Sequence, residues 1–310
     1  MALTLAEAKV GMADHIDQQI VDTLRRESRL LDLITFDNSV SPGTGGSTLT
    51  YGYLQIVTPS TAGIRKINAE YTPSEAKKDK KSANCAIMGG SFEIDRVIAQ
   101  TSGASDEVAF QIEQKTKAVA NMFSYKFINA VKETDEFDGL NKLLSGTANE
   151  VQSAVDLATA EKRNTNYQAG IDELDELEAL MDEKPTLWLM NKKTKARYTG
   201  IARRAGYLTQ GEDAFGRKID YINEIEVYEV EKYYDGSSSV EIIPDGDIYG
   251  VVLSLTGAHA FSPTGTNMVT KCLPDFKEAK AVHKGDVELV AGVALKSTLK
   301  AVHLKAYSAE

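Results

Sequence analysis

The clearest periodic pattern in the chain is an apolar stripe of helical spacing between residues 105 and 131. Ser105 is placed to cap the N-terminus of such a helix, and Asp106 and Glu107 suit the positive end of its dipole. The stripe consists of Val108, Ile112, Val119, Phe123, Phe127 and Val131, separated by polar positions. At 1.5 Å per residue the pattern predicts a helix of about 40 Å, long enough to be the spine of the molecule.

A long two-stranded hairpin is predicted before this helix. Residues 47–57 are rich in Thr, Tyr and Leu, and residues 83–98 form a second strand-like segment that Gly89 and Gly90 interrupt. An eleven-residue strand spans about 35 Å, and an isolated hairpin is only marginally stable in water. We therefore expect this hairpin to be an arm that lies on another surface in an assembly.

The segment between the two strands, residues 58–82, is polar and contains a basic cluster. The cluster consists of Lys77, Lys78, Lys80 and Lys81. We expect it at the tip of the hairpin, where it is either a solvated loop or a contact with an acidic neighbour. Reversing these charges to Glu is then expected to impair assembly and to leave the subunit folded.

The N-terminal part reads as short amphipathic helices followed by a flexible break. Over residues 3–36, Ile16, Ile20 and Leu24 keep a four-residue spacing. The glycine-rich stretch 41–46 is followed by a strand and not by a helix, and it lacks the Gly-Lys-Ser/Thr ending of a phosphate-binding loop. It is therefore interpreted as a flexible loop.

The second half of the chain mixes helices and strands. Ile171, Leu174, Leu177 and Leu180 predict the buried stripe of an acidic helix, which Pro185 stops. Its carboxylates are expected outside, at Asp172, Glu173, Asp175, Glu176 and Glu178. The apolar run 186–190 predicts a buried strand, followed by a basic helix over 192–205 that Asn191 caps and Gly206 ends. Further strands are predicted at 221–234, 240–243 and 248–261, and from Phe276 onward two strands are expected to return to the first unit.

Composition and charge narrow the possible functions. The 310 residues include 42% apolar and 26% charged side chains, and no stretch approaches the roughly 20 apolar residues of a membrane span. Glu7 and Lys9 interrupt the region where a secretory signal would be apolar, so we expect a cytoplasmic environment. Cys85 and Cys272 are far apart and are expected to be reduced. The net charge of −10 disfavours tight binding to nucleic acid.

Motifs for catalysis or metal binding are absent from the sequence. The four histidines form no HExxH arrangement, and neither GxSxG nor GxGxxG occurs. Residues 245–247 could suggest calcium, but the other ligands of an EF-hand are missing, and a tight turn is expected instead. No cofactor, metal or catalytic residue is therefore expected. The basic helix is expected to form ion pairs within or between subunits, although nucleic acid is an alternative partner.

The order of these parts resembles the Hong Kong 97 fold of tailed-phage major capsid proteins, an α+β fold. Three sequence segments carry the resemblance in detail: Ser41-Pro42-Gly43-Thr44-Gly45-Gly46-Ser47-Thr48-Leu49-Thr50-Tyr51, Phe137-Asp138-Gly139-Leu140, and Leu187-Trp188-Leu189-Met190-Asn191. They look like the junction of arm and hairpin, the segment after the spine helix, and the first strand and helix of the axial domain. The resemblance covers essentially the whole chain.

The resemblance implies a division of the chain into five parts. Residues 1–46 are expected to be an N-terminal arm and 47–98 an extended hairpin loop. Residues 99–145 are expected to form a peripheral domain with the spine helix, 146–262 an α/β axial domain, and 263–310 strands that complete the peripheral domain. The hairpin of the family lies across the adjacent subunit, and some relatives form a covalent bond there through a lysine.

The resemblance also implies the function. We expect a structural protein and no enzyme, which self-assembles through hexamers and pentamers into an icosahedral shell enclosing double-stranded DNA. The virion capsid is its expected location, after assembly in the host bacterial cytoplasm and without a membrane. Portal and decoration proteins are further expected partners. Because the chain passes almost directly from Met1 into the arm, a separate scaffolding protein, or none, is expected.

Three other functions remain open at this point. One is a tail or decoration protein, which would lack the long spine helix. An encapsulin-type nanocompartment shell shares the fold and encloses a protein cargo, and the genes beside this one would distinguish it from a virus. A hydrolase with a site assembled from distant residues is the alternative of a different class, and it would need a pocket with convergent titratable groups.

Overall fold

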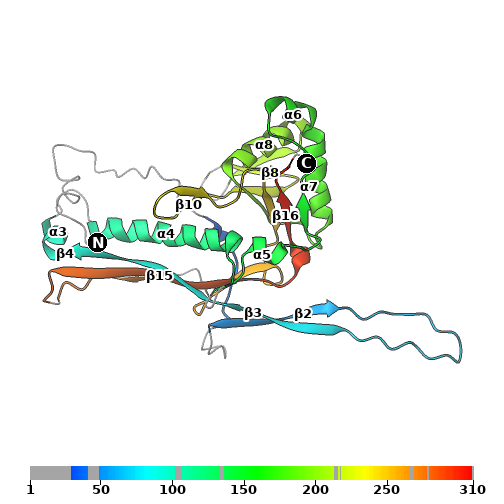
Figure 1. Cartoon of the computed structure of the whole chain (residues 1–310), viewed down its shortest axis with the longest axis horizontal. Helices are drawn as coiled ribbons and strands as arrows, with labels where there is room; N and C mark the ends of the chain where they lie inside the picture. Colours follow the sequence, from blue (N-terminus) through cyan, green and yellow to red (C-terminus); the bar gives the residue numbers. More distant parts are fainter. Residues whose placement is uncertain are drawn as a thin grey trace.

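The computed structural model describes residues 29–40, 49–101, 107–132, 136–212, 216, 218–265, 269–277 and 279–308. They form an elongated spine unit, a layered α/β unit beside one end of it, and a hairpin that projects beyond both (Figure 1). The predicted helical pieces around Ile16, Ile20 and Leu24, the cap at Ser105 and the glycine-rich loop 41–46 lie outside the described residues. No helix of the described part is long and apolar enough to cross a lipid bilayer.

The spine unit is a long β-ribbon covered by one helix. Strand β4 (Ala86–Asp95) pairs antiparallel over its whole length with β15 (Val282–Leu295), and α4 (Glu107–Asn129) packs on one face of this ribbon. Side chains on β4 alternate between the buried face, with Met88, Phe92 and Ile94, and an exposed face. Helix and ribbon match in length, because 23 helical and ten extended residues each span about 35 Å.

The predicted stripe of the spine helix is confirmed over its central part. Val119, Phe123 and Phe127 are buried, and Val108 and Ile112 are partly buried against the core. The prediction for Val131 was wrong: α4 ends at Asn129, and the Val131 side chain is 58% exposed. The sequence does not mark this end of the helix, because residues 130–138 contain neither glycine nor proline.

The turn after the spine helix explains why its sequence is Phe137-Asp138-Gly139-Leu140. Phe137 is fully buried, and the Asp138 carboxylate accepts a hydrogen bond from the Lys132 amide at 2.8 Å. The Gly139 amide donates to the Ala130 carbonyl at 2.9 Å, and a Cβ at Gly139 would lie 2.7 Å from backbone atoms of Ile128 and Ala130. Only glycine permits this close approach, after which α5 (Leu140–Leu144) begins.

Short strands complete the sheet of the spine unit. β14 (Thr270–Cys272) pairs with the first half of β15, and β13 (Ala258–Phe261) pairs with its second half. β1 (Phe36–Asp37) joins β13 in parallel, preceded by the short helix α2 (Leu30–Leu33). Helix α3 (Arg96–Thr101) follows β4 directly, so the predicted strand over 83–98 ends at Asp95.

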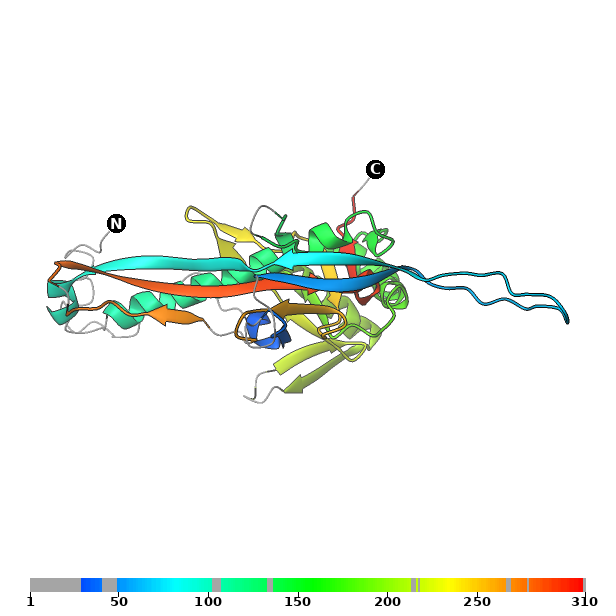
Figure 2. The same cartoon turned by 90° about the horizontal axis from the view of Figure 1, so that it is seen from below.

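The hairpin differs from the prediction in its second strand. It consists of β2 (Thr50–Thr58) and β3 (Lys77–Asn84), paired antiparallel from Thr50 with Asn84 to Thr58 with Lys77. The residues predicted as its second strand belong mostly to β4, which pairs with β15 in the spine. β3 and β4 follow each other almost in line, so that hairpin and spine form one long ribbon (Figure 2).

The α/β unit is built on a seven-stranded mixed sheet. Its strand order is β5-β16-β12-β6-β9-β8-β7. In chain order the strands are β5 (Glu150–Gln152), β6 (Leu187–Met190), β7 (Leu208–Glu212), β8 (Lys218–Ile222), β9 (Ile225–Glu229), β12 (Ile248–Val251) and β16 (Ala301–Lys305). A separate small hairpin, β10 (Lys232–Tyr234) with β11 (Ser239–Glu241), packs against α4.

The two faces of this sheet pack on different partners. On β6, Trp188 and Met190 belong to the core beneath α7 (Tyr167–Ala179) and α8 (Lys192–Ala205). Leu187 and Leu189 belong to the core that includes Phe123 and Phe127 of the spine helix. The predicted buried run is therefore confirmed, and it is apolar throughout because both faces of the sheet are covered.

The helices of this unit follow the sequence pattern with two exceptions. Asn191 caps α8 by accepting a hydrogen bond from the Thr194 amide, and Gly206 ends it with a φ of 83°. On α7, Leu180 was predicted inside but lies beyond the helix and is 40% exposed. Glu173 was predicted outside but is buried, where it accepts hydrogen bonds from the Ser153 hydroxyl and the Ala154 amide. The short helix α6 (Ala160–Thr165) precedes α7.

The C-terminal strands divide between the two units. β15 joins the spine unit as predicted, but β16 lies inside the seven-stranded sheet between β5 and β12. Conversely β13, expected in the axial domain, pairs with β15 in the spine. Both strands are short and buried except at Lys305, so their sequences contain no alternation that could indicate which sheet they enter.

Candidate assembly interface

The root of the hairpin is anchored to the spine unit by one face of β2. The Tyr51 hydroxyl donates a hydrogen bond to the Asp37 carboxylate at 3.0 Å, and its ring stacks on Phe261 with centroids 4.8 Å apart. Two residues on, the Tyr53 hydroxyl donates to the Leu295 carbonyl at 3.3 Å, and the Gln55 amide donates to the Lys296 carbonyl at 3.2 Å. Alternate residues of β2 thus face the body of the subunit.

Burial around Tyr51 shifts the pKa values of its neighbours. Burial, and then the nearby Asp37 carboxylate, raise the pKa of Tyr51, so its hydroxyl remains a hydrogen-bond donor. Burial of Asp37 opposes ionisation, but hydrogen bonds from Ser39 and Tyr51 outweigh it and lower the pKa of Asp37. His259, fully buried 3.3 Å from the Tyr51 hydroxyl, has its pKa lowered by burial. At the root of the hairpin, a neutral His259, the phenol of Tyr51 and the carboxylate of Asp37 are therefore packed together.

The opposite face of β2 is exposed in the part of the subunit that the structure describes. The side chains of Leu54 and Ile56 are 64% and 70% exposed, and their cross-strand neighbours on β3 are Lys80 and Lys78. Residues paired across an antiparallel ribbon share a face, so apolar and basic side chains alternate on one exposed surface. We call the surface formed by Leu54, Ile56, Lys78 and Lys80 the outer arm face.

The four predicted lysines lie along β3 and not at the tip of the hairpin. Lys77 pairs with Thr58 at the distal end of the ribbon, and Lys81 pairs with Tyr53 near the root. Lys81 forms an exposed ion pair with Asp79 at 3.1 Å, which contributes only about 0–1 kcal/mol to folding. The sequence analysis expected these lysines in the loop at the tip, whereas they belong to β3, the second strand of the hairpin.

The distal loop, residues 59–76, projects beyond the body of the subunit (Figures 1 and 2). Its two extended halves are joined by hydrogen bonds between Thr61 and Ser74. The side chains of Ile64 and Ile67 are as exposed as in an extended peptide, at 104% and 90%. Fully burying one isoleucine is worth about 1.5–3 kcal/mol, so this loop gains most of its stability only when another surface covers it.

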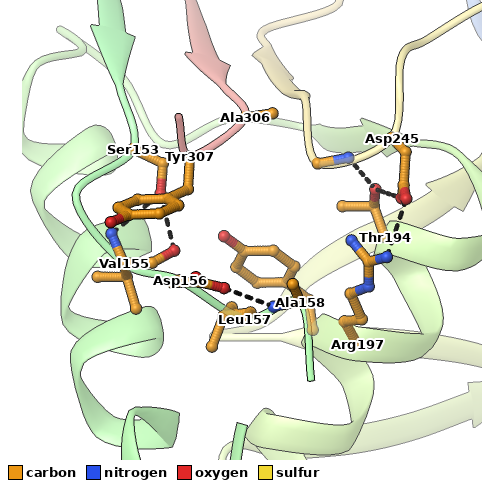
Figure 3. Close-up of a pocket in the computed structure, with 12 residues that line it drawn as sticks. Ser153, Val155, Asp156, Leu157, Ala158, Thr194, Arg197, Asp245, Ala306 and Tyr307 are labelled. Atoms are coloured by element: carbon orange, nitrogen blue, oxygen red, sulfur yellow. Dashed lines mark hydrogen bonds and ion pairs between the residues drawn. The ribbon is translucent and has the colours of Figure 1, made fainter. Parts of the chain in front are cut away.

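A cavity with several polar groups in its lining lies in the α/β unit, away from the hairpin. Its volume is about 360 Å³, and Ser153, residues 155–158, the first half of α8, the turn at Asp245 and the C-terminal Tyr307 line it (Figure 3). The Arg197 guanidinium donates to Asp245 at 2.8 Å, and the Thr194 hydroxyl accepts from the Gly246 amide at 2.8 Å. Burial raises the pKa of Tyr198, which also lines the cavity.

The polar groups of this cavity hold a turn in place. Arg197 and Thr194 both bind the 245–246 turn, which confirms that this segment is a tight turn, with a φ of 98° at Gly246. The described histidines, His259, His283 and His303, do not line the cavity. Among the described residues no group of three or more His, Cys, Asp or Glu side chains is arranged to hold a metal ion. The cavity therefore offers no pairing of a nucleophile with a histidine base.

Comparisons with known proteins identify the fold. No protein-family model and no curated protein matches the sequence. The structure is similar to the SrpI encapsulin of Synechococcus elongatus PCC 7942, with 13% identity, a TM-score of 0.64 and 100% of both chains covered. It is also similar to the capsid of Myoviridae phage XM1, with 13% identity, a TM-score of 0.59, and 94% of this chain and 96% of that chain covered.

A third similar structure is that of the phage G major capsid proteins with their decoration proteins. Here the identity is 9% and the TM-score 0.61, with 99% of this chain and 100% of that chain covered. The likeness thus extends over the whole length of shell-forming chains of both kinds. It confirms the α+β fold of the Hong Kong 97 type, with spine helix, extended hairpin and α/β unit in the expected order.

Proposed function

We propose that the chain is the major capsid protein of a tailed bacteriophage and acts by assembling with copies of itself into an icosahedral shell around double-stranded DNA. One observation carries the proposal. The subunit holds out a hairpin whose root is packed on its own spine and whose outer face and distal loop are exposed. If the arm lies on an adjacent subunit, that contact buries the apolar side chains that the isolated subunit leaves exposed.

The charge of the arm supports contact with a protein surface. Residues 58–82 contain six basic and three acidic side chains, a net charge of +3, in a chain of net charge −10. The rest of the chain is therefore strongly acidic, so the basic arm of one copy is attracted electrostatically to the body of another copy. The overall negative charge limits adhesion of the enclosed DNA to the wall of the shell.

We propose a revised division of the subunit, which the strand pairing supports. The extended loop is best taken as residues 49–84, since β4 belongs to the spine. The peripheral domain then consists of β4, α3, α4 and β13 to β15, and the axial domain of the seven-stranded sheet with α6 to α8. We infer a structural role without catalysis, because the polar groups of the cavity beside α8 bind one another.

A nanocompartment shell is the second candidate, and the similarity to the SrpI encapsulin is the observation that favours it. We prefer the phage capsid to the nanocompartment because several phage structures of the same fold match over nearly the whole chain. Particles from the source organism would distinguish the two, since a virion encloses nuclease-protected double-stranded DNA and a nanocompartment encloses protein. Decoration, portal and scaffolding proteins remain proposed partners of the phage shell.

The proposal is tested by charge reversal on the arm. Replacing Lys77, Lys78, Lys80 and Lys81 by Glu changes the arm from +3 to −5, so it repels a neighbouring subunit. We expect the variant subunit to keep its circular dichroism spectrum and its unfolding midpoint but to lose assembly in sedimentation velocity. Shells formed at the concentration needed by the wild type would contradict the proposed role of the arm.

A further inference from the structure

Three loops that meet at one end of the α/β unit each expose a leucine. We call these residues the leucine surface: Leu180 after α7, Leu255 between β12 and β13, and Leu299 before β16. Their side chains are 40%, 47% and 43% exposed. Hydrogen bonds join the three loops, because the Asp182 amide donates to the Leu299 carbonyl at 3.0 Å and the Lys300 ammonium donates to the Thr256 hydroxyl at 2.8 Å.

An open groove lies beside the leucine surface, at the C-terminal end of α7. Its volume is about 510 Å³, and its lining includes one lysine and the carboxylates of Asp175, Glu178, Asp182 and Glu183. The lysine, Lys184, is paired with Glu224 at 3.2 Å. Within the described residues neither Glu178 nor Asp182 forms an ion pair. The groove therefore presents negative charge next to exposed apolar side chains, which suits a partner that is both basic and apolar.

The tip of the arm, residues 64–67, has this complementary character. It consists of two isoleucines, whose side chains are 104% and 90% exposed, and two cations between them. A turn holds the tip in shape: the Ala69 amide donates to the Lys66 carbonyl at 3.1 Å, and the Arg65 guanidinium lies 5.4 Å above the centre of the Tyr71 ring. The two carboxylates of the distal loop lie on its returning half.

The tip does not reach the groove of its own subunit while the hairpin is paired. The side-chain amide of Gln55 binds the Lys296 carbonyl at the root, and the nine extended residues that lead from Gln55 to Ile64 span about 30 Å. Leu299 is three residues from Lys296 and thus at most about 10 Å from the root. Because β2 and β3 stay paired as far as Thr58, the groove accepts the tip of a second copy only.

The arm and the groove lie on the same side of the subunit. Figure 1 shows the arm projecting past the border of the α/β unit that α7 forms. Two copies related by a two-fold axis beside this border therefore have their arms side by side, pointing in opposite directions. Such a contact is isologous, so each tip lies at the groove of the other copy and every favourable contact occurs twice.

We propose that the tip of the arm binds the leucine surface and the acidic groove of a second copy in such a reciprocal contact. The inference rests on the proposed function, since it identifies the surface on which the arm lies. Ile64 and Ile67 cover the leucines, and Arg65 and Lys66 pair with the carboxylates of the groove. Added salt weakens the charged part of the contact and leaves the apolar part in place.

Charge reversal and charge exchange test the contact in the full-length chain. One variant carries Arg65→Glu and Lys66→Glu in the tip, a second carries Glu178→Lys and Asp182→Lys in the groove, and a third combines all four. Sedimentation velocity over a range of subunit concentrations measures assembly, and electron microscopy identifies the shells. Circular dichroism confirms that each variant is folded.

Each single-site variant is expected to need an about tenfold or higher subunit concentration for half-assembly, because like charges replace opposite charges in both halves of the contact. The exchange variant is expected to return to within about threefold of the wild type, since the pairs re-form with opposite polarity. A matched control is Asp172→Lys with Glu176→Lys, which makes the charge change of the second variant at exposed positions of α7 outside the groove. It is expected to assemble like the wild type.

Cross-linking tests whether the contact joins two copies. In a Cys272→Ser background, in which Cys85 is the remaining native cysteine and is buried, one chain carries Lys66→Cys and another carries Asp182→Cys. A short bismaleimide is expected to give a covalent dimer when the two chains are mixed, and at least about tenfold less when either chain is treated alone, because two copies of one site do not meet. Asp172→Cys in place of Asp182→Cys is the matched control and is expected to give no dimer.

The outcomes separate this inference from the proposed function. Single-site variants that assemble like the wild type, an exchange variant that assembles no better than either of them, or a mixture without cross-linked dimer overturns the contact between tip and groove and leaves the shell function intact. A wild-type chain that stays monomeric, alone and when co-expressed with the neighbouring genes, overturns the shell function and with it the contact.

Discussion

The outer arm face provides the sharpest test of how the hairpin works. We consider the double substitution Leu54→Thr and Ile56→Thr, which removes the apolar side chains of this face and keeps residues that favour strands. In the subunit these side chains are 64% and 70% exposed, so most of their hydrophobic burial is still available to a partner. The substitution therefore affects a contact between subunits far more than it affects folding.

The magnitude follows from the exposed fractions. Full burial of a leucine or isoleucine side chain is worth about 1.5–3 kcal/mol, and about two thirds of that remains unrealised in the subunit, or about 1–2 kcal/mol per residue. Two residues give about 2–4 kcal/mol per arm, which corresponds to about 30-fold to 1,000-fold in the affinity of one contact. Since the contact recurs around every ring, shell formation is expected to fail at concentrations where the wild type assembles.

Two assays separate assembly from folding. Urea unfolding of the unassembled subunit is expected to show a loss below about 0.5 kcal/mol, as for other surface substitutions. Sedimentation velocity over a range of subunit concentrations is expected to show no shells. A matched control is Val240→Thr, which replaces a 41% exposed side chain on β11. The reasoning is refuted if the double variant assembles like the wild type, or if its subunit loses more than about 2 kcal/mol of stability.

Three further predictions concern the subunit itself. Phe123→Ala leaves a cavity beneath the spine helix at a fully buried position and is expected to cost about 3–5 kcal/mol in urea unfolding; a cost below 1 kcal/mol would contradict the described core. Burial lowers the pKa of His259 below its ordinary value of 6.5, so the unfolded chain binds the proton more readily and stability falls as pH drops below about 6.5; His259→Gln is expected to flatten this dependence, and an unchanged pH profile would argue against it. Burial raises the pKa of Cys85 to about 12 while Cys272 is exposed, so a thiol reagent is expected to modify one cysteine in the native subunit and two after unfolding, with fast labelling of both as the contrary result.

Elements with strong periodicity were predictable from the sequence. The stripe through Val119, Phe123 and Phe127 identifies the spine helix because helical spacing places these residues on one face. Asn191 and Gly206 mark the two ends of α8 because each residue type suits its terminal geometry. The exception at Val131 shows the limit of this reasoning, since a stripe can continue into a segment that is no longer helical.

Strand pairing was less predictable, for a physical reason. β3 contains Lys-Lys-Asp-Lys-Lys, which has low strand propensity, and it is extended only because β2 pairs with it. β16 is a short strand, buried except at Lys305, that either sheet could accommodate. The root of the hairpin was missed because Tyr51, Asp37 and His259 come from distant parts of the chain. The local signal for this group was the pair of tyrosines, Tyr51 and Tyr53, at alternate positions of β2.

The central claim is that the chain forms closed shells, and electron microscopy of the purified full-length protein tests it most directly. Negatively stained fractions from size-exclusion chromatography are expected to contain closed shells, or rings of five and six subunits, with the chain alone or after co-expression with the neighbouring genes. A protein that elutes only as a monomer under both conditions, at high concentration, would contradict the account.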